Sequence, residues 1–269
     1  MAITTRDQLI AAIAVGPGLD FLKASVSTQA GGRWANLFRA AGRPTAAASP
    51  AAGAAGNACS SATPGALGFA NPTATANTYL AGFAVNAQQP GVVLLYDRLV
   101  ETANLNGTVV TAQAVGSVPL PPRATGGVNV ELWLEVHTAL GATASSTVTA
   151  SYTNQAGVAG RTATLLGGIQ GTSVAGNMYP FALQAGDTGV RTVESVTSTT
   201  STGTAGSFGV TLIKRLAQAT VVSNNIGAEQ GWPTTGLAEI PDDACLALMM
   251  ASSTASTGNV VGSARIAQG

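Results

Sequence analysis

Apolar and polar residues alternate most regularly in GGVNVELWLEVHT, residues 126–138. One parity of this stretch is wholly aliphatic: Val128, Val130, Leu132, Leu134 and Val136. The other parity is polar or aromatic: Asn129, Glu131, Trp133, Glu135 and His137. A period of two residues is that of a β-strand, and burying five aliphatic side chains at roughly 1.5–3 kcal/mol each is enough to hold one. We expect the second parity to lie on the solvated outer face of a sheet.

Similar patterns continue from residue 91 to the end of the chain. The run GVVLLYDRLV (91–100) predicts a fully buried strand, and Asn106-Gly107 predicts a tight turn. Two threonine-rich runs within residues 146–166 flank a glycine-containing turn, as in a hairpin, and residues 242–269 suggest a final hairpin. Because no long helix intervenes, these strands indicate a mainly β protein with an antiparallel β-sandwich or jelly-roll-like domain.

Helical periodicity is confined to the beginning of the chain. Thr5 and Gln8 have the spacing of a capping box, and Gly16-Pro17-Gly18 predicts the end of the helix. Between them lies an apolar stripe: Leu9, Ile10 and Ile13. Residues 31–44, GGRWANLFRAAGRP, predict a second short helix with apolar residues on one side. Two interpretations remain open: an arm that docks on a neighbouring protein, or helices that pack on their own domain.

No charged residue occurs between Pro44 and Tyr96. The first part of this segment, residues 44–65, consists mostly of Ala, Gly, Pro and Ser, which is typical of a long loop or extended arm. An interdomain linker is the alternative. The predicted organisation is therefore a helical N-terminal arm (1–45), an uncharged loop or arm that leads into the sheet (46–90), and an antiparallel β domain (91–269).

The composition favours a protein that works in an assembly. Charged residues make up 9 % of the chain, against roughly 25 % in typical soluble domains, and the net charge is zero. Bulk electrostatic attraction to nucleic acid or to an anionic membrane is therefore not expected. The chain contains no run of about 20 strongly apolar residues, so we expect no transmembrane helix. Asp7 and the Gly-Pro-Gly sequence argue against a signal peptide, so we expect synthesis in the cytoplasm without export.

Motifs for catalysis are missing. His137 is the only histidine, and carboxylates two and six residues away lie on the same predicted face. Neighbours on one face of a strand are about 7 Å apart, which is too far for direct contact, and no G-x-S-x-G sequence supplies a nucleophile. We therefore expect no catalytic residue. A β-fold glycan hydrolase remains an alternative, since two of the twelve acidic residues would suffice if they faced each other across a cleft.

Cofactor and metal sites are not expected either. The chain has no glycine-rich phosphate-binding loop, and Asp242-Asp243 lacks the spacing of a calcium loop, which favours a simple turn. Two cysteines, Cys59 and Cys245, are too few for a structural zinc site. In a reducing cytoplasm we expect them to be separate buried thiols rather than a disulfide.

Some large apolar residues are candidates for contacts with a partner. The three tryptophans stand outside continuous apolar runs, and aromatic residues often anchor interfaces. The interface candidates are Leu9, Ile13, Trp34, Phe38, Trp133 and Trp232. Packing in a small satellite core is the alternative for each tryptophan.

Several stretches resemble the head decoration, or cement, proteins of tailed bacteriophages: TTRDQLIAAIA, GVVLLYDRLVETANLNGTVVTAQAV, VELWLEVHT, SYTNQAGVAGRTATLL, IPDDACLALMM and GSARIAQG. The likeness covers nearly the whole chain but includes no diagnostic binding motif. It implies a homotrimer made in the host cytoplasm that binds the major capsid protein on the outer surface of the virion, with no direct contact to nucleic acid or membrane. A phage tail or fibre component that contacts the host is the alternative.

Overall fold

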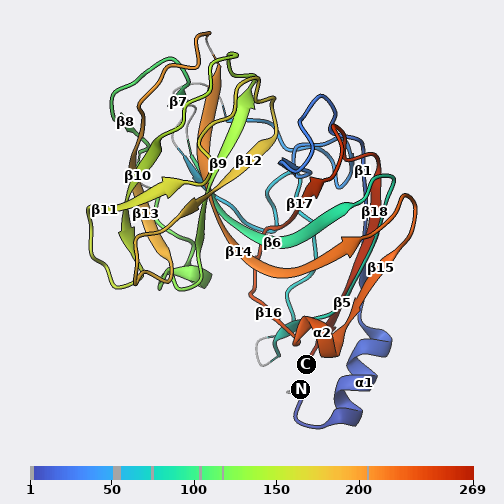
Figure 1. Cartoon of the computed structure of the whole chain (residues 1–269). Coiled ribbons are helices and arrows are strands. Elements are labelled where there is room, and N and C mark those ends of the chain that lie inside the picture. The colour runs from blue at the N-terminus through green and yellow to red at the C-terminus, as the bar shows by residue number, and fades with distance from the viewer. Residues whose placement is uncertain (1–2, 51–55, 74–75, 103–104, 117, 205) are drawn as a thin grey trace. The chain divides into compact units, whose positions relative to one another are not determined.

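A computed structural model describes residues 3–50, 56–73, 76–102, 105–116, 118–204 and 206–269 (Figure 1). The chain forms two compact units. The terminal unit comprises residues 1–47, 60–97 and 215–269, and the central unit comprises residues 48–59 and 98–214. The chain passes from one unit to the other within β6 (Gly91–Glu101) and β14 (Ser207–Val221). These units differ from the contiguous segments 1–45, 46–90 and 91–269 that the composition predicts.

The terminal unit contains an antiparallel six-stranded sheet in the order β15-β5-β18-β1-β3, with β16 also paired to β5. Its strands are β1 (Gly18–Lys23), β3 (Gly42–Arg43), β5 (Thr78–Ala87), β15 (Ala228–Gly231), β16 (Glu239–Ile240) and β18 (Val260–Gln268). A second set of antiparallel strands is formed by β2 (Trp34–Asn36), β17 (Leu246–Ser252) and β6. Apolar side chains from both sets, among them Phe83, Leu95 and Leu248, form one buried cluster.

The predicted final hairpin is wrong, because its two halves belong to different sheets. The strand β17 pairs with β2 and β6, whereas β18 lies between β5 and β1. The uncharged segment also contributes more than a loop, since β5 occupies its last part. Residues 51–55 and 74–75 of that segment lie outside the described residues.

The predicted first helix is confirmed as α1 (Arg6–Val15), with both hydrogen bonds of the Thr5–Gln8 capping box. Leu9 is buried against Ala81 and Ala267 of the sheet, so the helix packs on its own unit. Gly16 ends α1 where the backbones are close: a Cβ atom there would lie 1.9 Å from the carbonyl oxygen of Ile266. The predicted apolar stripe is wrong in one respect, because Ile10 is 54 % exposed.

The predicted second helix is wrong. Residues 34–36 form β2 and pair with β17, and the following residues turn back toward the core. The side chain of Asn36 holds this turn by accepting a hydrogen bond from the backbone N–H of Phe38 at 2.9 Å. Because Leu37 and Phe38 are fully buried in this conformation, the local helical pattern yields to strand pairing and burial.

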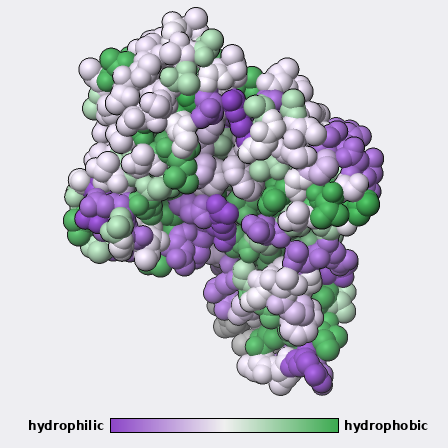
Figure 2. All heavy atoms as spheres, in the orientation of Figure 1, coloured by the Kyte–Doolittle hydropathy of each residue, from purple (hydrophilic) through white to green (hydrophobic). Residues whose placement is uncertain are grey.

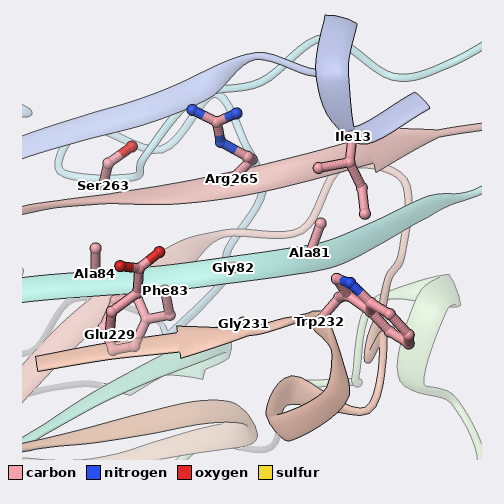
Figure 3. A pocket seen from close by; sticks show the side chains of 10 residues that line it. All are labelled: Ile13, Ala81, Gly82, Phe83, Ala84, Glu229, Gly231, Trp232, Ser263 and Arg265. Atoms are coloured by element: carbon pink, nitrogen blue, oxygen red, sulfur yellow. The ribbon is translucent and has the colours of Figure 1, made fainter. Parts of the chain in front are cut away.

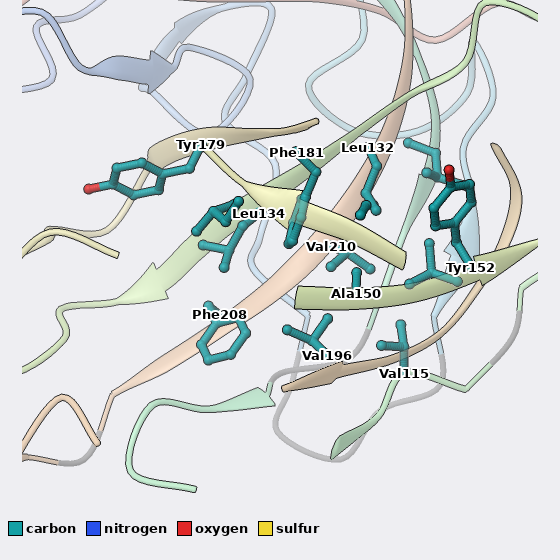
Figure 4. Close-up of a cluster of buried hydrophobic side chains, with 14 of the residues drawn as sticks. Val115, Leu132, Leu134, Ala150, Tyr152, Tyr179, Phe181, Val196, Phe208 and Val210 are labelled. Carbon is teal, nitrogen blue, oxygen red and sulfur yellow. The ribbon is translucent and has the colours of Figure 1, made fainter. Parts of the chain in front are cut away.

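The central unit contains a sheet in the order β14-β9-β12-β11-β10-β13-β8. In addition to β14, its strands are β8 (Gln113–Ala114), β9 (Glu131–Thr138), β10 (Val148–Asn154), β11 (Arg161–Leu165), β12 (Asn177–Ala182) and β13 (Val190–Ser198). Two short strands also belong to this unit: β4 (Asn57–Ala58) pairs with β6, and β7 (Leu105–Asn106) pairs with β14. The unit also contains a 3₁₀ turn, formed by Pro122–Ala124. Figure 4 shows the aliphatic and aromatic side chains that fill its core. The predicted β10–β11 hairpin and the turn at Asn106-Gly107 are both confirmed. The protein is mainly β with a sandwich-like, jelly-roll-like arrangement, as predicted.

Residues 131–138 of the alternating stretch form a strand, β9, as predicted. The face of β9 that carries Glu131, Trp133, Glu135 and His137 is not solvated. Trp133 and Glu135 are fully buried and His137 is 6 % exposed. Polar partners make this burial tolerable: Trp133 donates from its indole nitrogen to Glu131 at 2.9 Å, and Glu135 is part of a buried ion pair. The alternation therefore marks a strand whose two faces are both covered.

Candidate interaction surface

One face of the six-stranded sheet is turned away from the core of the terminal unit, and small side chains dominate it. Along β5, Gly82 lies between Gly231 of β15 and Arg265 of β18. The next outward position, Ala84, lies between Glu229 of β15 and Ser263 of β18. Strand alternation explains the arrangement, since the intervening Phe83 and Val85 point into the core. The result is a low floor of glycine and alanine with three polar side chains around it.

Residues of two helices border this face, and together with the strands they line a hollow of about 480 Å³ (Figure 3). Ile13 comes from α1, and Trp232 begins the short helix α2 (Trp232–Thr235). Trp232 is 41 % exposed. A second hollow of about 370 Å³ shares Ala84 and Glu229 with the first and continues along the strands toward Val261. The terminal unit therefore carries an open, partly apolar depression.

The polar side chains of the hollow are not used by the fold. Among the described residues, the side chains of Arg265, Glu229 and Ser263 make no hydrogen bond or ion pair. An arginine provides only donors, a carboxylate only acceptors, and a hydroxyl provides both. These groups are available to a ligand or a partner.

The six interface candidates are placed very differently. Leu9, Phe38 and Trp133 are buried within this chain, whereas Ile13 and Trp34 are half-buried. Trp232 alone among the six is exposed, and it lies in the hollow together with Ile13. The sequence thus named two residues of this surface. It missed Arg265, Glu229 and Ser263, because only the strand register brings them together.

Glu135, the carboxylate two residues before His137, belongs to a buried ion-pair network. Arg98 donates from Nη2 to Glu135 at 2.5 Å and to Glu101 at 3.0 Å. Thr211 donates from its hydroxyl to the same Glu135 oxygen at 2.9 Å. The Arg98 and Glu135 side chains are both 0 % exposed. Such a network fixes the local packing of β6, β9 and β14 within the central unit.

A second cluster surrounds Asp187 in the central unit. Arg161 donates to it from Nε at 2.9 Å and from Nη2 at 3.2 Å, and Asn154 and the Tyr152 hydroxyl also donate to it. The hydrogen bonds from Arg161, followed by those from Tyr152 and Asn154, lower the pKa of Asp187 from 3.8 to about 2. Burial and the hydrogen bond to Asp187 raise the pKa of Tyr152. The sequence gives no signal for this cluster, because its members come from separate strands and a loop.

The lowered pKa of Asp187 predicts a loss of stability in acid. Because the folded pKa is below the unfolded pKa of about 4, the ionised carboxylate stabilises the fold above pH 4, and this contribution is lost as the pH falls toward 2. Unfolding by urea, measured between pH 7 and pH 2, should show a shallower acid decline in Asp187→Asn than in the wild-type protein. Asp20→Asn, which changes an exposed aspartate without a hydrogen-bond partner in the described structure, is the control. An identical decline in Asp187→Asn and wild type would contradict the assignment.

The other residues that the sequence singles out, Asp243, Cys59 and Cys245, are hydrogen-bonded or buried within the fold. Asp243 lies in a turn, where its side chain accepts hydrogen bonds from Ser61 and Asn71, as expected for a turn. Cys59 and Cys245 are both buried, as predicted. Among the described residues, no group of three or more His, Cys, Asp or Glu side chains is arranged to hold a metal ion. In the same residues, no helix has the length and apolar character needed to cross a bilayer.

Comparisons with known proteins give weak likenesses only. No family model and no curated protein matches the chain. Among solved structures, the VP2 subviral particle of infectious bursal disease virus is similar at 9 % identity with a TM-score of 0.23, covering 94 % of this chain and 80 % of that chain. The Gx strain of the same virus is similar at 9 % identity, with a TM-score of 0.20 and coverage of 95 % and 84 %. TM-scores this low do not establish a shared fold.

Proposed function

We propose that this chain is a structural protein of a tailed-phage virion that binds the outer surface of the head and stabilises the shell by bridging capsid subunits. The observation that carries the proposal is the apolar, outward-facing side of α1. Ile10 is 54 % exposed and Val15 is 85 % exposed, although the opposite side of the same helix is already buried through Leu9. A helix that is apolar on both sides is expected to be covered on both sides.

More of the exposed large apolar residues belong to the terminal unit than to the central unit. Figure 2 shows apolar residues on the surface in the region where Figure 1 draws α1. Of the eleven large hydrophobic residues that are exposed in the described structure, four belong to the central unit and seven to the terminal unit: Ile10, Val15, Leu22, Val222, Ile226, Trp232 and Val261. This distribution favours the terminal unit as the part that contacts the shell.

The charges support the same proposal. Five of the 24 charged side chains are buried, namely Lys23, Asp97, Arg98, Glu101 and Glu135. The surface is therefore even less charged than the composition suggests. Monomeric proteins normally remain apart from one another through surface charge. A surface with so little charge opposes close packing against neighbouring subunits only weakly.

A homotrimer is part of the proposal, with the major capsid protein as partner. Burying Ile10 and Val15 contributes roughly 1.5–3 kcal/mol for each side chain, which is a weak contact by itself. Several such contacts made simultaneously raise the overall affinity by about 10²–10⁴. Only an assembled shell presents several capsid subunits at the right spacing, so binding stabilises the assembled state.

The double variant Ile10→Lys/Val15→Lys tests the contact. Lysine is compatible with a helix, and at its C-terminal end it complements the helix dipole, so α1 should remain folded. We expect attachment to purified heads that lack this protein to weaken by at least about tenfold, since two apolar contacts are replaced by charges. Binding is measured by cosedimentation, with thermal unfolding as the check on folding.

Val158→Lys/Leu166→Lys is the matched control, because both residues are exposed hydrophobics of the central unit. Equal attachment of both double variants would show that α1 is not the contact. The copy number per purified virion tests the location: hundreds of copies indicate a shell protein, whereas tens or fewer indicate the tail or fibre alternative.

A further inference from the structure

The hollow on the open sheet face has a glycine floor that the fold itself does not require. Gly82 stands inside β5 and pairs with Gly231 of β15. A Cβ atom at Gly82 would lie 3.5 Å from the nearest heavy atom, the carbonyl oxygen of Gln230, and one at Gly231 would lie 3.5 Å from Pro233, both ordinary contacts. Neither glycine has a positive φ. Glycine weakens a strand, and where no packing reason exists it often marks the close approach of a ligand.

Above this floor, the side chains combine an aromatic ring with unused polar groups (Figure 3). We propose that the hollow is a carbohydrate-binding site that holds a pyranose ring of a glycan. The exposed indole of Trp232 offers a flat apolar surface for the C–H face of the ring. Arg265 donates to ring hydroxyls, Glu229 accepts from them, and Ser263 does either.

The charges around the hollow favour a neutral ligand over an anionic one. Arg265 and Glu229 both line it, and the two make no ion pair with each other. The outward-facing Asp20 of β1 lies opposite Ser263 in the sheet and adds a second carboxylate beside it. A phosphate or sulfate would meet net negative charge, whereas sugar hydroxyls can satisfy both donors and acceptors. The volume of about 480 Å³ lies within the range of small-molecule sites, about 300–1,000 Å³.

This site goes beyond attachment to a shell and is separable from it. Ile10 and Val15, which carry the proposed shell contact, do not line the hollow. Sugar binding by the isolated full-length chain therefore tests the site whether or not the chain binds a capsid.

The probes are the methyl glycosides of glucose, galactose, mannose, N-acetylglucosamine and rhamnose, offered separately to the full chain. Saturation-transfer NMR detects binding, and titration of tryptophan fluorescence gives the dissociation constant. We expect at least one glycoside to bind, and Trp232→Ala and Gly82→Val to weaken that binding by about tenfold or more. Valine at position 82 fills the floor of the hollow and favours a strand, so Gly82→Val should melt no lower than the wild-type protein.

Gly68→Val and Arg43→Ala are the matched controls. Both residues are exposed in the terminal unit and neither lines the hollow, and a Cβ atom at Gly68 meets nothing within 4 Å. Binding that is unchanged in these controls and lost in Gly82→Val and Trp232→Ala supports the site. Absence of transfer to all five glycosides, or equal binding by Gly82→Val and wild type, overturns it. Self-association that Gly82→Val abolishes, without any sugar binding, would instead assign the hollow to a second copy of the chain and also overturn the proposal.

Discussion

Replacing Arg98 by alanine is expected to destabilise the central unit by about 3–5 kcal/mol. Its guanidinium forms ion pairs with Glu135 and Glu101, and the Glu135 side chain has no access to solvent. Without Arg98, the buried Glu135 carboxylate would lose the guanidinium that donates to it, while the hydroxyl of Thr211 would still donate to the same oxygen. Removing a charged donor from a buried carboxylate costs more than losing one hydrogen bond between neutral groups, so the effect should exceed that of ordinary surface substitutions.

Urea unfolding at neutral pH, followed by tryptophan fluorescence, measures this effect. The variant Arg98→Met/Glu135→Met removes both charges and should recover much of the lost stability, because apolar residues of similar size often replace a buried ion pair without loss. Arg161→Ala removes a partly exposed arginine from Asp187 and is expected to have a smaller effect. A loss below about 1 kcal/mol in Arg98→Ala would show that the network does not hold the unit together.

Replacing Trp133 by alanine should destabilise the protein by about 3–5 kcal/mol. The side chain is 0 % exposed, and its indole nitrogen donates to Glu131 at 2.9 Å. Truncation would leave a large cavity and remove one donor, and a rigid strand environment would close such a cavity only partly. This result would assign Trp133 to the core and remove it from the interface candidates.

Trp232→Ala is the comparison for this experiment, because it truncates an exposed tryptophan. We expect its midpoint of urea unfolding to remain close to that of the wild-type protein, within about 0.5 kcal/mol. Folded Trp133→Ala, assayed well below its unfolding temperature, should attach to heads as the wild-type protein does. Normal stability combined with lost attachment would restore Trp133 as a contact residue.

The β architecture follows from local pattern, because alternation and turn residues act over a few positions. The strand at 131–138, the β10–β11 hairpin and the capped first helix are confirmed on this basis. The prediction of a solvated second face of β9 is wrong because a polar side chain is not necessarily exposed. Glu135 is buried beside Arg98, which lies 37 positions earlier in the chain and donates a hydrogen bond to it. A single sequence does not display such a long-range pair.

Predictions of pairing were less successful than predictions of strands. The two strands of the C-terminal segment lie close in sequence but join different sheets, since β18 inserts between β1 and β5. The hollow has the same origin: its residues come from α1, β5, β15, α2 and β18. The sequence marks Trp232 as a tryptophan outside continuous apolar runs and Ile13 as part of the apolar stripe of the first helix, whereas Gly82 and Arg265 give no signal that sequence spacing could reveal.

The position of β18 between β1 and β5 has a consequence for biosynthesis. The strand β18 is synthesised long after β1 and β5 and completes the middle of the sheet between them. Until β18 has emerged from the ribosome, β1 and β5 would each present an unpaired edge, and such edges are prone to aggregate. Residues 98–214, by contrast, emerge as one continuous stretch and can begin to fold while the ribosome is still working. Chains that stop shortly before Val260 should therefore be insoluble, because they lack β18 (Val260–Gln268).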